Sequence, residues 1–235
     1  MKNTLLIIAI GILPVFESFK IPTMKTVEGA FIYQHQNGED WLMLKDNYLI
    51  HTSFNKNAKQ FHFSRGGVYT VDGQNLKWKV EFDTRDSKKV GQTESIHFEL
   101  KNESLNFDKK EYKRSDDGWS PLAGYFRISG RRQGEQMNDM PLAPRKTIKL
   151  LTANKFQWAA INTSTGEFFG TGGGSYTFEN GKYTENIEFF SRDSSRVGAS
   201  LQFSDTLQGR RWIHSGLSSK GDPIYEIWTR EPITY

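Results

Sequence analysis

Hydrophobic and polar residues alternate along most of the chain with a period of two. The alternation is clearest over residues 76–83, 96–100 and 155–160, where apolar positions are separated by polar or small ones. Because successive side chains of a strand point to opposite faces, each segment predicts a strand with one buried face. Turn-forming pairs separate such segments, among them Asp72-Gly73 and Asn180-Gly181. The pattern predicts an all-β protein built from short antiparallel strands.

The middle of the chain contains an internal repeat. A shift of about 107 positions aligns residues 41–91 with the second half of the chain without gaps. The clearest matches are residues 66–70 with residues 173–177, and Arg85-Asp86-Ser87 with Arg192-Asp193-Ser194. So many identities in one register predict that the two halves share one fold.

Both repeat units begin and end with the same motifs. Each opens with Gly-x-Phe and closes with an aromatic residue two positions before an arginine, at Gly29, Phe31 and Arg114 in the first unit and Gly124, Phe126 and Arg230 in the second. We expect the first unit to cover residues 25–115 and the second residues 118–235. A segment present only in the second unit, residues 131–145, predicts a loop or a lid.

Several short strands with one apolar face must curl or pair to bury that face. A closed barrel does so and also removes the exposed edges of the sheet. The expected fold is therefore two tandem small antiparallel β-barrels. One continuous sandwich made by both halves is the alternative.

The first residues have the features of a targeting segment. Lys2 precedes a short apolar run over residues 5–16, and Glu17 ends it. The run is too short to span a bilayer comfortably, so we expect a signal peptide over residues 1–20. The protein is then exported, to the periplasm, the cell surface or the medium. An uncleaved N-terminal anchor is the alternative, and would be the only contact with a membrane.

A series of motifs along the second unit carries a family resemblance. They are Gly124-Tyr125-Phe126 at its start, Gly174-Ser175-Tyr176, Tyr183-Thr184-Glu185 and Val197-Gly198 followed by Leu201 and Phe203 in its middle, and Glu226-Ile227-Trp228-Thr229-Arg230 at its end. With these motifs the unit resembles the lipocalin-like, or calycin-type, proteins, in particular exported bacterial members, and the first unit resembles them less closely. The chain has Phe where lipocalins usually have Trp, and it lacks their disulfide.

The resemblance implies roles for the terminal motifs and for the barrel mouth. Phe126 is expected to pack beneath Arg230, and Phe31 beneath Arg114, so that each pair closes a barrel floor. A small, largely apolar ligand is expected in the barrel mouth. Both expectations come from the shared fold, which by itself does not fix a function.

Composition and charge narrow the classes of function. Cysteine is absent, which removes disulfides, zinc-thiolate sites and thiol catalysis. The net charge is only +4, because 31 basic residues are interleaved with 27 acidic ones. Around Lys77-Trp78-Lys79 the alternation places the tryptophan inside and both lysines outside. We therefore expect no nucleic-acid partner.

Four residues of the second unit are candidate ligand contacts. Trp158 and Tyr176 are aromatic residues near an open barrel end, and His214 lies in a strand of mixed character. Arg192 could hold an anionic group at the pocket mouth.

The motif that contains Arg192 also has a structural interpretation. Asp86 and Asp193 favour turns, because their side chains can accept hydrogen bonds from the backbone that follows. The presence of the motif in both units favours this interpretation over a binding role.

The sequence contains no recognisable metal, cofactor or catalytic motif. The histidines show no metal-ligand spacing, so neither a metal nor a cofactor is expected. The glycine-rich run over residues 170–174 lacks the following Lys-Ser/Thr of a phosphate loop, and predicts a β-bulge or a tight corner. A hydrolase would pair Glu185 or Glu188 with Asp193, but Glu185 and Glu188 are three positions apart and face opposite sides of a strand.

Taken as a whole, the pattern favours a non-catalytic, exported binding protein. It would hold a small apolar or amphipathic ligand, or a glycan, in the mouth of the second barrel. Two alternatives from other classes stay open. A hydrolase of envelope or other polysaccharides requires two carboxylates at the same mouth, and a structural or adaptor protein of the envelope requires solid barrels without a cavity near about 300 Å³.

Overall fold

The structure is a computed structural model that describes residues 27–218 and 220–232. The expected signal peptide, residues 1–20, lies outside this part of the chain. The described residues form antiparallel strands and two short 3-10 turns, η1 (Ser87–Lys89) and η2 (Ser194–Arg196). Within these residues, no helix has the length and hydrophobicity needed to cross a bilayer.

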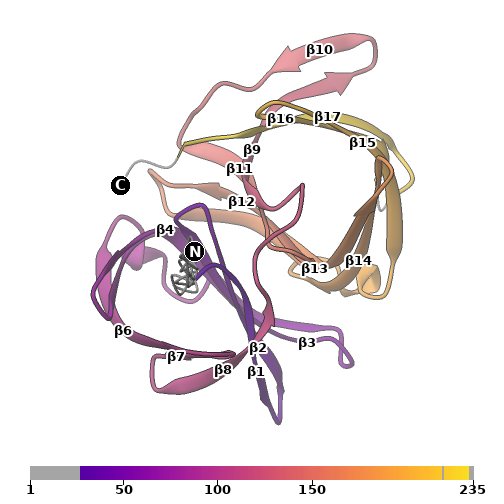
Figure 1. Cartoon of the computed structure of the whole chain (residues 1–235). Helices are drawn as coiled ribbons and strands as arrows, with labels where there is room; N and C mark the ends of the chain where they lie inside the picture. Colours follow the sequence, from indigo (N-terminus) through magenta and orange to yellow (C-terminus); the bar gives the residue numbers. More distant parts are fainter. Residues whose placement is uncertain (1–26, 219, 233–235) are drawn as a thin grey trace, which may run out of the picture.

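The first half of the chain closes into an eight-stranded barrel (Figure 1). Strands that follow one another in sequence pair antiparallel, and β8 returns to pair with β1. The strands are β1 (Gly29–His35), β2 (Gly38–Lys45), β3 (Tyr48–Asn55), β4 (Gln60–Asp72), β5 (Asn75–Asp83), β6 (Thr93–Lys101), β7 (Ser104–Phe107) and β8 (Lys110–Asp116).

The second half repeats this barrel and adds one strand. The wall runs from β9 through β11 to β17, and the pairing of β17 with β9 closes it. The strands are β9 (Gly124–Gln133), β10 (Gln136–Asp139), β11 (Arg145–Leu151), β12 (Lys155–Asn162), β13 (Glu167–Glu179), β14 (Lys182–Phe190), β15 (Ser200–Gln208), β16 (Arg211–Leu217) and β17 (Pro223–Arg230). The prediction of two tandem antiparallel barrels is confirmed, and the single sandwich is excluded.

The additional strand lies in the segment that is unique to the second unit. Residues 131–145 were expected to form a loop or a lid, but residues 131–133 continue β9 and residues 136–139 form β10. The outer half of β9 pairs with β10, whereas its inner half pairs with β11. This hairpin therefore extends the barrel wall beyond the end of β11, and projects from the barrel in Figure 1.

The repeated glycine pair explains why both barrels bend at the same place. The register of β4 with β5 shifts between Gly66 and Gly67, and the register of β13 with β14 shifts between Gly173 and Gly174. A Cβ atom on Gly67 or Gly174 would collide with a backbone carbonyl of the partner strand. Only glycine fits this close approach, and each pair produces a β-bulge.

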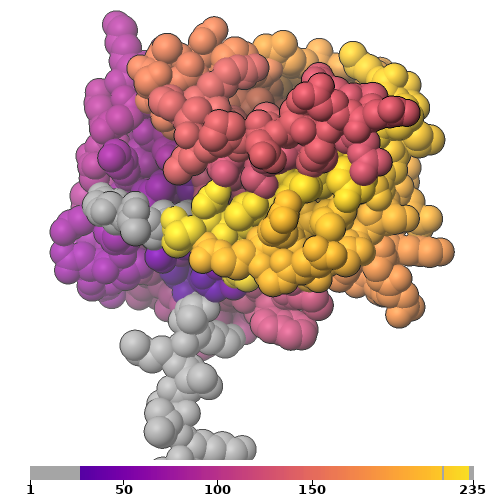
Figure 2. Space-filling view, turned by 90° about the horizontal axis from the view of Figure 1, so that it is seen from above, coloured from indigo at the N-terminus to yellow at the C-terminus, as the bar shows by residue number. Residues whose placement is uncertain are grey.

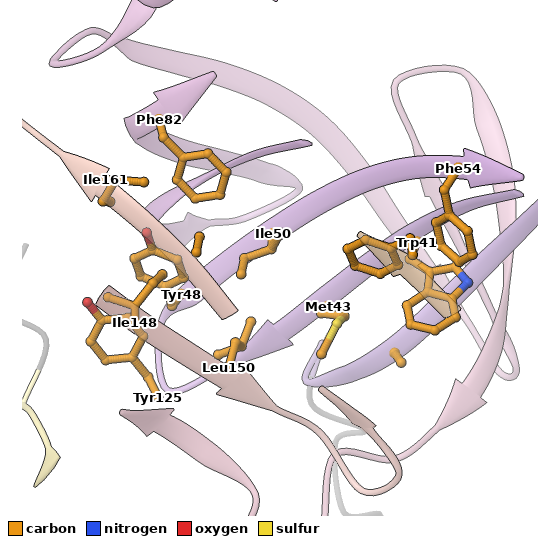
Figure 3. Packing of buried hydrophobic residues seen from close by; sticks show 13 residues of the cluster. Trp41, Met43, Tyr48, Ile50, Phe54, Phe82, Tyr125, Ile148, Leu150 and Ile161 are labelled. Atoms are coloured by element: carbon orange, nitrogen blue, oxygen red, sulfur yellow. The ribbon is translucent and has the colours of Figure 1, made fainter. Parts of the chain in front are cut away.

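The two barrels pack side by side and share an apolar core that lies between them (Figure 3). The ring centres of Tyr48 and Tyr125 are 4.5 Å apart, and those of Phe54 and Phe189 are 4.6 Å apart. Each barrel also has its own interior core. In the space-filling view the first barrel, in indigo to magenta, and the second, in rose-red through orange to yellow, form one continuous body (Figure 2).

A buried amide joins the barrels at the centre of this interface. Gln157 of β12 accepts a hydrogen bond from Thr52 of β3 at 2.7 Å. Its amide nitrogen donates to Ser64 of β4 at 2.8 Å and to Thr171 of β13 at 3.0 Å. Because Gln157 is fully buried, these contacts satisfy polar groups that would otherwise be costly in an apolar interface.

Candidate ligand pocket in the second barrel

The second barrel is hollow at one end, where a pocket of about 770 Å³ opens between the β9–β10 hairpin and the β16–β17 loop. Apolar and aromatic side chains line part of its wall, among them Trp158, Ile187, Phe190, Leu201, Phe203, Ile224 and Trp228. Four buried polar side chains also line it, namely Lys149, Glu185, His214 and Glu226. Arg131, Arg132 and Asp222 lie among the lining residues contributed by the hairpin and the loop.

A buried ion pair lies in the pocket wall. Lys149 of β11 and Glu185 of β14 are only 4% and 5% exposed, and Nζ of the lysine lies 2.8 Å from Oε1 of the glutamate. The Tyr183 hydroxyl donates a second hydrogen bond to the same oxygen, at 3.0 Å. Burial raises the pKa of Tyr183 well above 10.0, so its hydroxyl keeps the proton that it donates. Buried charges are tolerated when they are paired and hydrogen-bonded in this way.

Aromatic rings surround the ammonium group of Lys149. Its Nζ atom lies 5.0 to 5.7 Å from four ring centres, those of Phe156, Tyr183, Trp212 and Trp228. Ring faces carry partial negative charge and attract a cation at this distance. The rings and Glu185 together hold the lysine charge inside the barrel.

A second buried pair is formed by His214 of β16 and Asp205 of β15. The Nδ1 atom of His214 lies 3.0 Å from Oδ1 of Asp205, and the Trp212 indole donates to Oδ2 at 2.8 Å. Since the carboxylate can only accept, Nδ1 carries a hydrogen, and in the neutral ring Nε2 is then an acceptor. His214 is 2% exposed, and its ring lies 4.1 Å from that of Phe203.

A third pair links the additional hairpin to the last strand. Arg131 of β9 donates to Oε1 of Glu226 at 2.6 Å. The other oxygen of Glu226 accepts from the Trp228 indole at 3.0 Å. The hairpin is thus fixed to β17 at the pocket by a charge-assisted hydrogen bond.

The equivalent level of the first barrel is filled. The repeat places Trp78 at the position of Glu185, and Arg65 at the position of Gly172. The Arg65 guanidinium lies 4.3 Å from the centre of the Trp78 ring and donates to Glu94 at 2.6 Å. Trp78 is fully buried and Arg65 nearly so. Stacked side chains therefore occupy the space that is open in the second barrel.

Small and apolar replacements open the second barrel at the same level. Phe190 and Leu201 stand where the first unit has Asp83 and Glu94. A Cβ atom on Gly172 would lie 2.8 Å from the Phe190 ring and 2.9 Å from the Trp158 indole nitrogen. The glycine thus allows both aromatic rings to lie against the strand and leaves the volume between the walls unfilled.

Two of the four candidate ligand contacts meet in this pocket. Trp158 and His214 both line it. Tyr176 is buried elsewhere, where its hydroxyl donates to the Thr152 carbonyl and lies 2.6 Å from the Ser120 hydroxyl. Arg192 is exposed and is not among the lining residues.

The repeated Arg-Asp-Ser motif forms the start of the two 3-10 turns. Asp86 accepts a hydrogen bond from the Lys88 amide, and Asp193 accepts one from the Ser195 amide, both at 3.1 Å. Asp193 is not a lining residue, so the structure does not bring it together with Glu185. Glu188 faces the other barrel, with its carboxylate 3.6 Å from Lys56.

The terminal motifs are arranged differently in the two barrels. In the first, the Arg114 guanidinium lies 4.4 Å from the centre of the Phe31 ring, and a Cβ atom on Gly29 would collide with the Asp116 carbonyl. In the second, a Cβ atom on Gly124 would lie 3.0 Å from both Arg230 and Phe126. Phe126 packs edge-on against Trp212, while Arg230 binds an aspartate of the first barrel.

Sequence reasoning did not find Lys149, Glu226 or the hairpin arginines. The signal for Lys149 and Glu185 lies in the repeat, because these charged residues replace Leu42 and Trp78 at positions that face inward. When an inward position carries a charge in just one of the two units, it indicates a functional difference between the units. No comparable signal marks Arg131, since the first unit has no equivalent segment.

Comparison with known proteins leaves the pocket as the main guide to function. The sequence matches no model of a protein family, and a search of curated proteins found no match. Among the described residues, no group of three or more His, Asp or Glu side chains is placed to hold a metal ion.

Proposed function

We propose that the protein is an exported, non-catalytic binding protein of lipocalin-like type, whose second barrel holds one small amphipathic ligand. The observation that carries this proposal is the contrast between the two barrels at equivalent positions. Stacked Arg65 and Trp78 fill this level of the first barrel, whereas the second has a pocket of about 770 Å³ there. Pockets for small molecules usually measure about 300–1,000 Å³ and combine apolar walls with a few polar groups.

The lining supports an amphipathic ligand over a purely apolar one. Trp158, Phe190 and Leu201 offer apolar surface, while Lys149, Glu185 and His214 supply polar atoms in the same pocket. A hydrocarbon seated against those polar groups would remove water from them without replacing its hydrogen bonds. A ligand with an apolar body and one polar end satisfies both parts of the wall.

The lipocalin-like assignment and the export of the protein are supported separately. Two eight-stranded antiparallel barrels with an open end, and the contact between Phe31 and Arg114, agree with the family resemblance. Export is supported by the short apolar run over residues 5–16 after Lys2.

Native mass spectrometry of the protein purified from its host tests the proposal. We expect a stoichiometric small molecule that leaves on denaturation. An Ala160→Trp variant should lose this molecule, because Ala160 lines the pocket and an indole would occupy its volume. Ala58→Trp is the matched control, since Ala58 is exposed in the β3–β4 turn of the first barrel. A ligand retained equally by both variants would place binding elsewhere.

One observation favours a hydrolase as the second candidate: the carboxylates of Glu185 and Glu226 line the same pocket. Both are already engaged, Glu185 by Lys149 and Glu226 by Arg131, and this favours fixed binding groups over an acid–base pair. Turnover of a glycoside that is lost in Glu226→Gln but kept in Glu99→Gln would support the hydrolase instead. The pocket volume speaks against a purely structural adaptor, which requires solid barrels.

A further inference from the structure

Two polar atoms of the pocket wall, both on side chains that are largely buried, have no hydrogen-bond partner among the described residues. Glu185 uses Oε1 for both Lys149 and Tyr183, and no described group bonds to its Oε2. His214 uses Nδ1 for Asp205, and no described group bonds to its Nε2. The two side chains are 7% and 2% exposed, and both line the pocket.

Both atoms can accept a hydrogen bond from a ligand, His214 in its neutral tautomer. The carboxylate oxygen of Glu185 can only accept. The Nδ1 hydrogen of His214 is directed to Asp205, so the neutral ring presents a lone pair at Nε2. A ligand that donates to both atoms would therefore form two hydrogen bonds with side chains that are largely shielded from solvent.

The charge around the pocket favours a cationic donor. The cations that line it, Arg131, Arg132 and Lys149, are equal in number to the anions, Glu185, Asp222 and Glu226. Asp205 adds a further negative charge behind His214. Its partners among the described residues, His214 and Trp212, are a histidine and a neutral indole, with no lysine or arginine. Counted without the histidine, four carboxylates, those of Glu185, Asp222, Glu226 and Asp205, face three cations in this part of the barrel.

We propose that the ligand is a small amphipathic amine that binds with its ammonium group innermost. This inference rests on the proposed binding function. The ammonium donates to Oε2 of Glu185 and to Nε2 of His214, and the aromatic walls add cation–π attraction. The apolar body then lies along Trp158, Phe190 and Phe203, and any polar far end reaches Arg131 at the hairpin.

Three probes with similar bodies and different head groups test the charge preference. They are 2-phenylethylamine, 2-phenylethanol and 3-phenylpropionate, measured by isothermal titration with the full-length protein. We expect the amine to bind at least about tenfold more tightly than the alcohol, and the carboxylate more weakly than both, as a charge-assisted hydrogen bond in a buried site requires. Equal binding of amine and alcohol, preference for the carboxylate, or no binding of the amine overturns the proposal.

A paired variant tests whether Glu185 provides the preference. Lys149→Met combined with Glu185→Gln removes both charges, so that no lone buried charge is left to unfold the barrel. We expect the amine to lose its advantage while the alcohol still binds. The control is Lys101→Met with Glu99→Gln, which removes an exposed ion pair of the first barrel and should leave the preference intact.

The same measurements separate this inference from the proposed function. If the alcohol binds as well as the amine, and Ala160→Trp abolishes both, the pocket is a binding site without amine selectivity. If Ala160→Trp leaves all probe binding unchanged, the pocket is not the site, and both proposals fail.

Discussion

Arg230, at the end of β17, binds Asp46 in the β2–β3 turn of the other barrel through two parallel hydrogen bonds. Nε lies 2.8 Å from Oδ2, and Nη2 lies 2.8 Å from Oδ1. The Tyr125 amide donates to the same carboxylate at 3.0 Å. One side chain of the first barrel therefore holds the first and the last strand of the second.

Replacing Asp46 should weaken the association of the barrels without unfolding them. Asp46 has φ +50°, which asparagine tolerates better than alanine, so Asp46→Asn is the appropriate change. We expect a loss of about 1 kcal/mol, because the bidentate pair is lost but is partly exposed to solvent. Urea unfolding measures it, with Asp72→Asn as the control at an exposed pair. An unchanged midpoint would contradict a stabilising role for the pair.

Acid should destabilise the protein through Asp46. Burial alone would raise the pKa of this carboxyl, but hydrogen bonds from Arg230 and from the Tyr125 amide lower it below the usual 3.8. A carboxyl whose pKa is lower in the folded state stabilises the protein fully above its unfolded pKa, and this stabilisation is lost as pH falls through the folded value. We expect the urea concentration at the unfolding midpoint to decrease when the pH is lowered beyond about 4, and to decrease less in Asp46→Asn. If the urea midpoint decreased equally with pH in both proteins, Asp46 would be excluded as a source of the acid sensitivity.

The polar network at Gln157 should make the two barrels unfold together. We expect the wild-type protein to unfold in one transition, because a shared apolar core lies between the barrels. Gln157→Leu removes the bonds to Thr52, Ser64 and Thr171 and leaves buried hydroxyls with fewer partners, at a cost of about 1–3 kcal/mol.

Differential scanning calorimetry of this variant tests the coupling. We expect a lower transition temperature and a separation into two transitions. Gln60→Leu, at an exposed position of β4, is the matched control. A single transition at the wild-type temperature in Gln157→Leu would show that the amide does not couple the barrels.

Much of the fold was predictable from the sequence because each barrel obeys a local rule. The alternation over residues 76–83 gave β5 its inward and outward faces, and the repeated Gly-Gly pair marked the bend in each barrel. The interface was harder to predict. Residues 41–44 are apolar at every position, which indicates a strand buried on both faces but not what covers the second face.

The pocket depends on relations that a single sequence does not show. Lys149 and Glu185 are 36 positions apart, and only the curvature of the barrel brings the side chains of β11 and β14 into contact. The hairpin was mistaken for a loop because Gly134 and the polar residues around it have turn composition, whereas the register of β9 with β10 is set in three dimensions. Of the expected contacts, Trp158 and His214 line the pocket because the strand alternation turns them inward.

A double variant tests whether the pocket reduces the stability of the protein. It replaces the buried pair Lys149 and Glu185 by the residues that stand at the equivalent positions of the first unit. The repeat predicts that Lys149→Leu with Glu185→Trp rebuilds the filled level seen at Leu42 and Trp78. Replacing a buried ion pair by apolar side chains of suitable volume is often neutral, or stabilising by about 1–4 kcal/mol. Glu185→Gln alone leaves Lys149 without its counter-charge, and should cost about 3–5 kcal/mol of stability. We therefore expect the double variant to be at least as stable as the wild type in urea unfolding, and to bind no ligand in native mass spectrometry. A double variant that is as unstable as the single one would show that the two barrels do not tolerate the same packing, and that the pair is needed for folding as well as for binding.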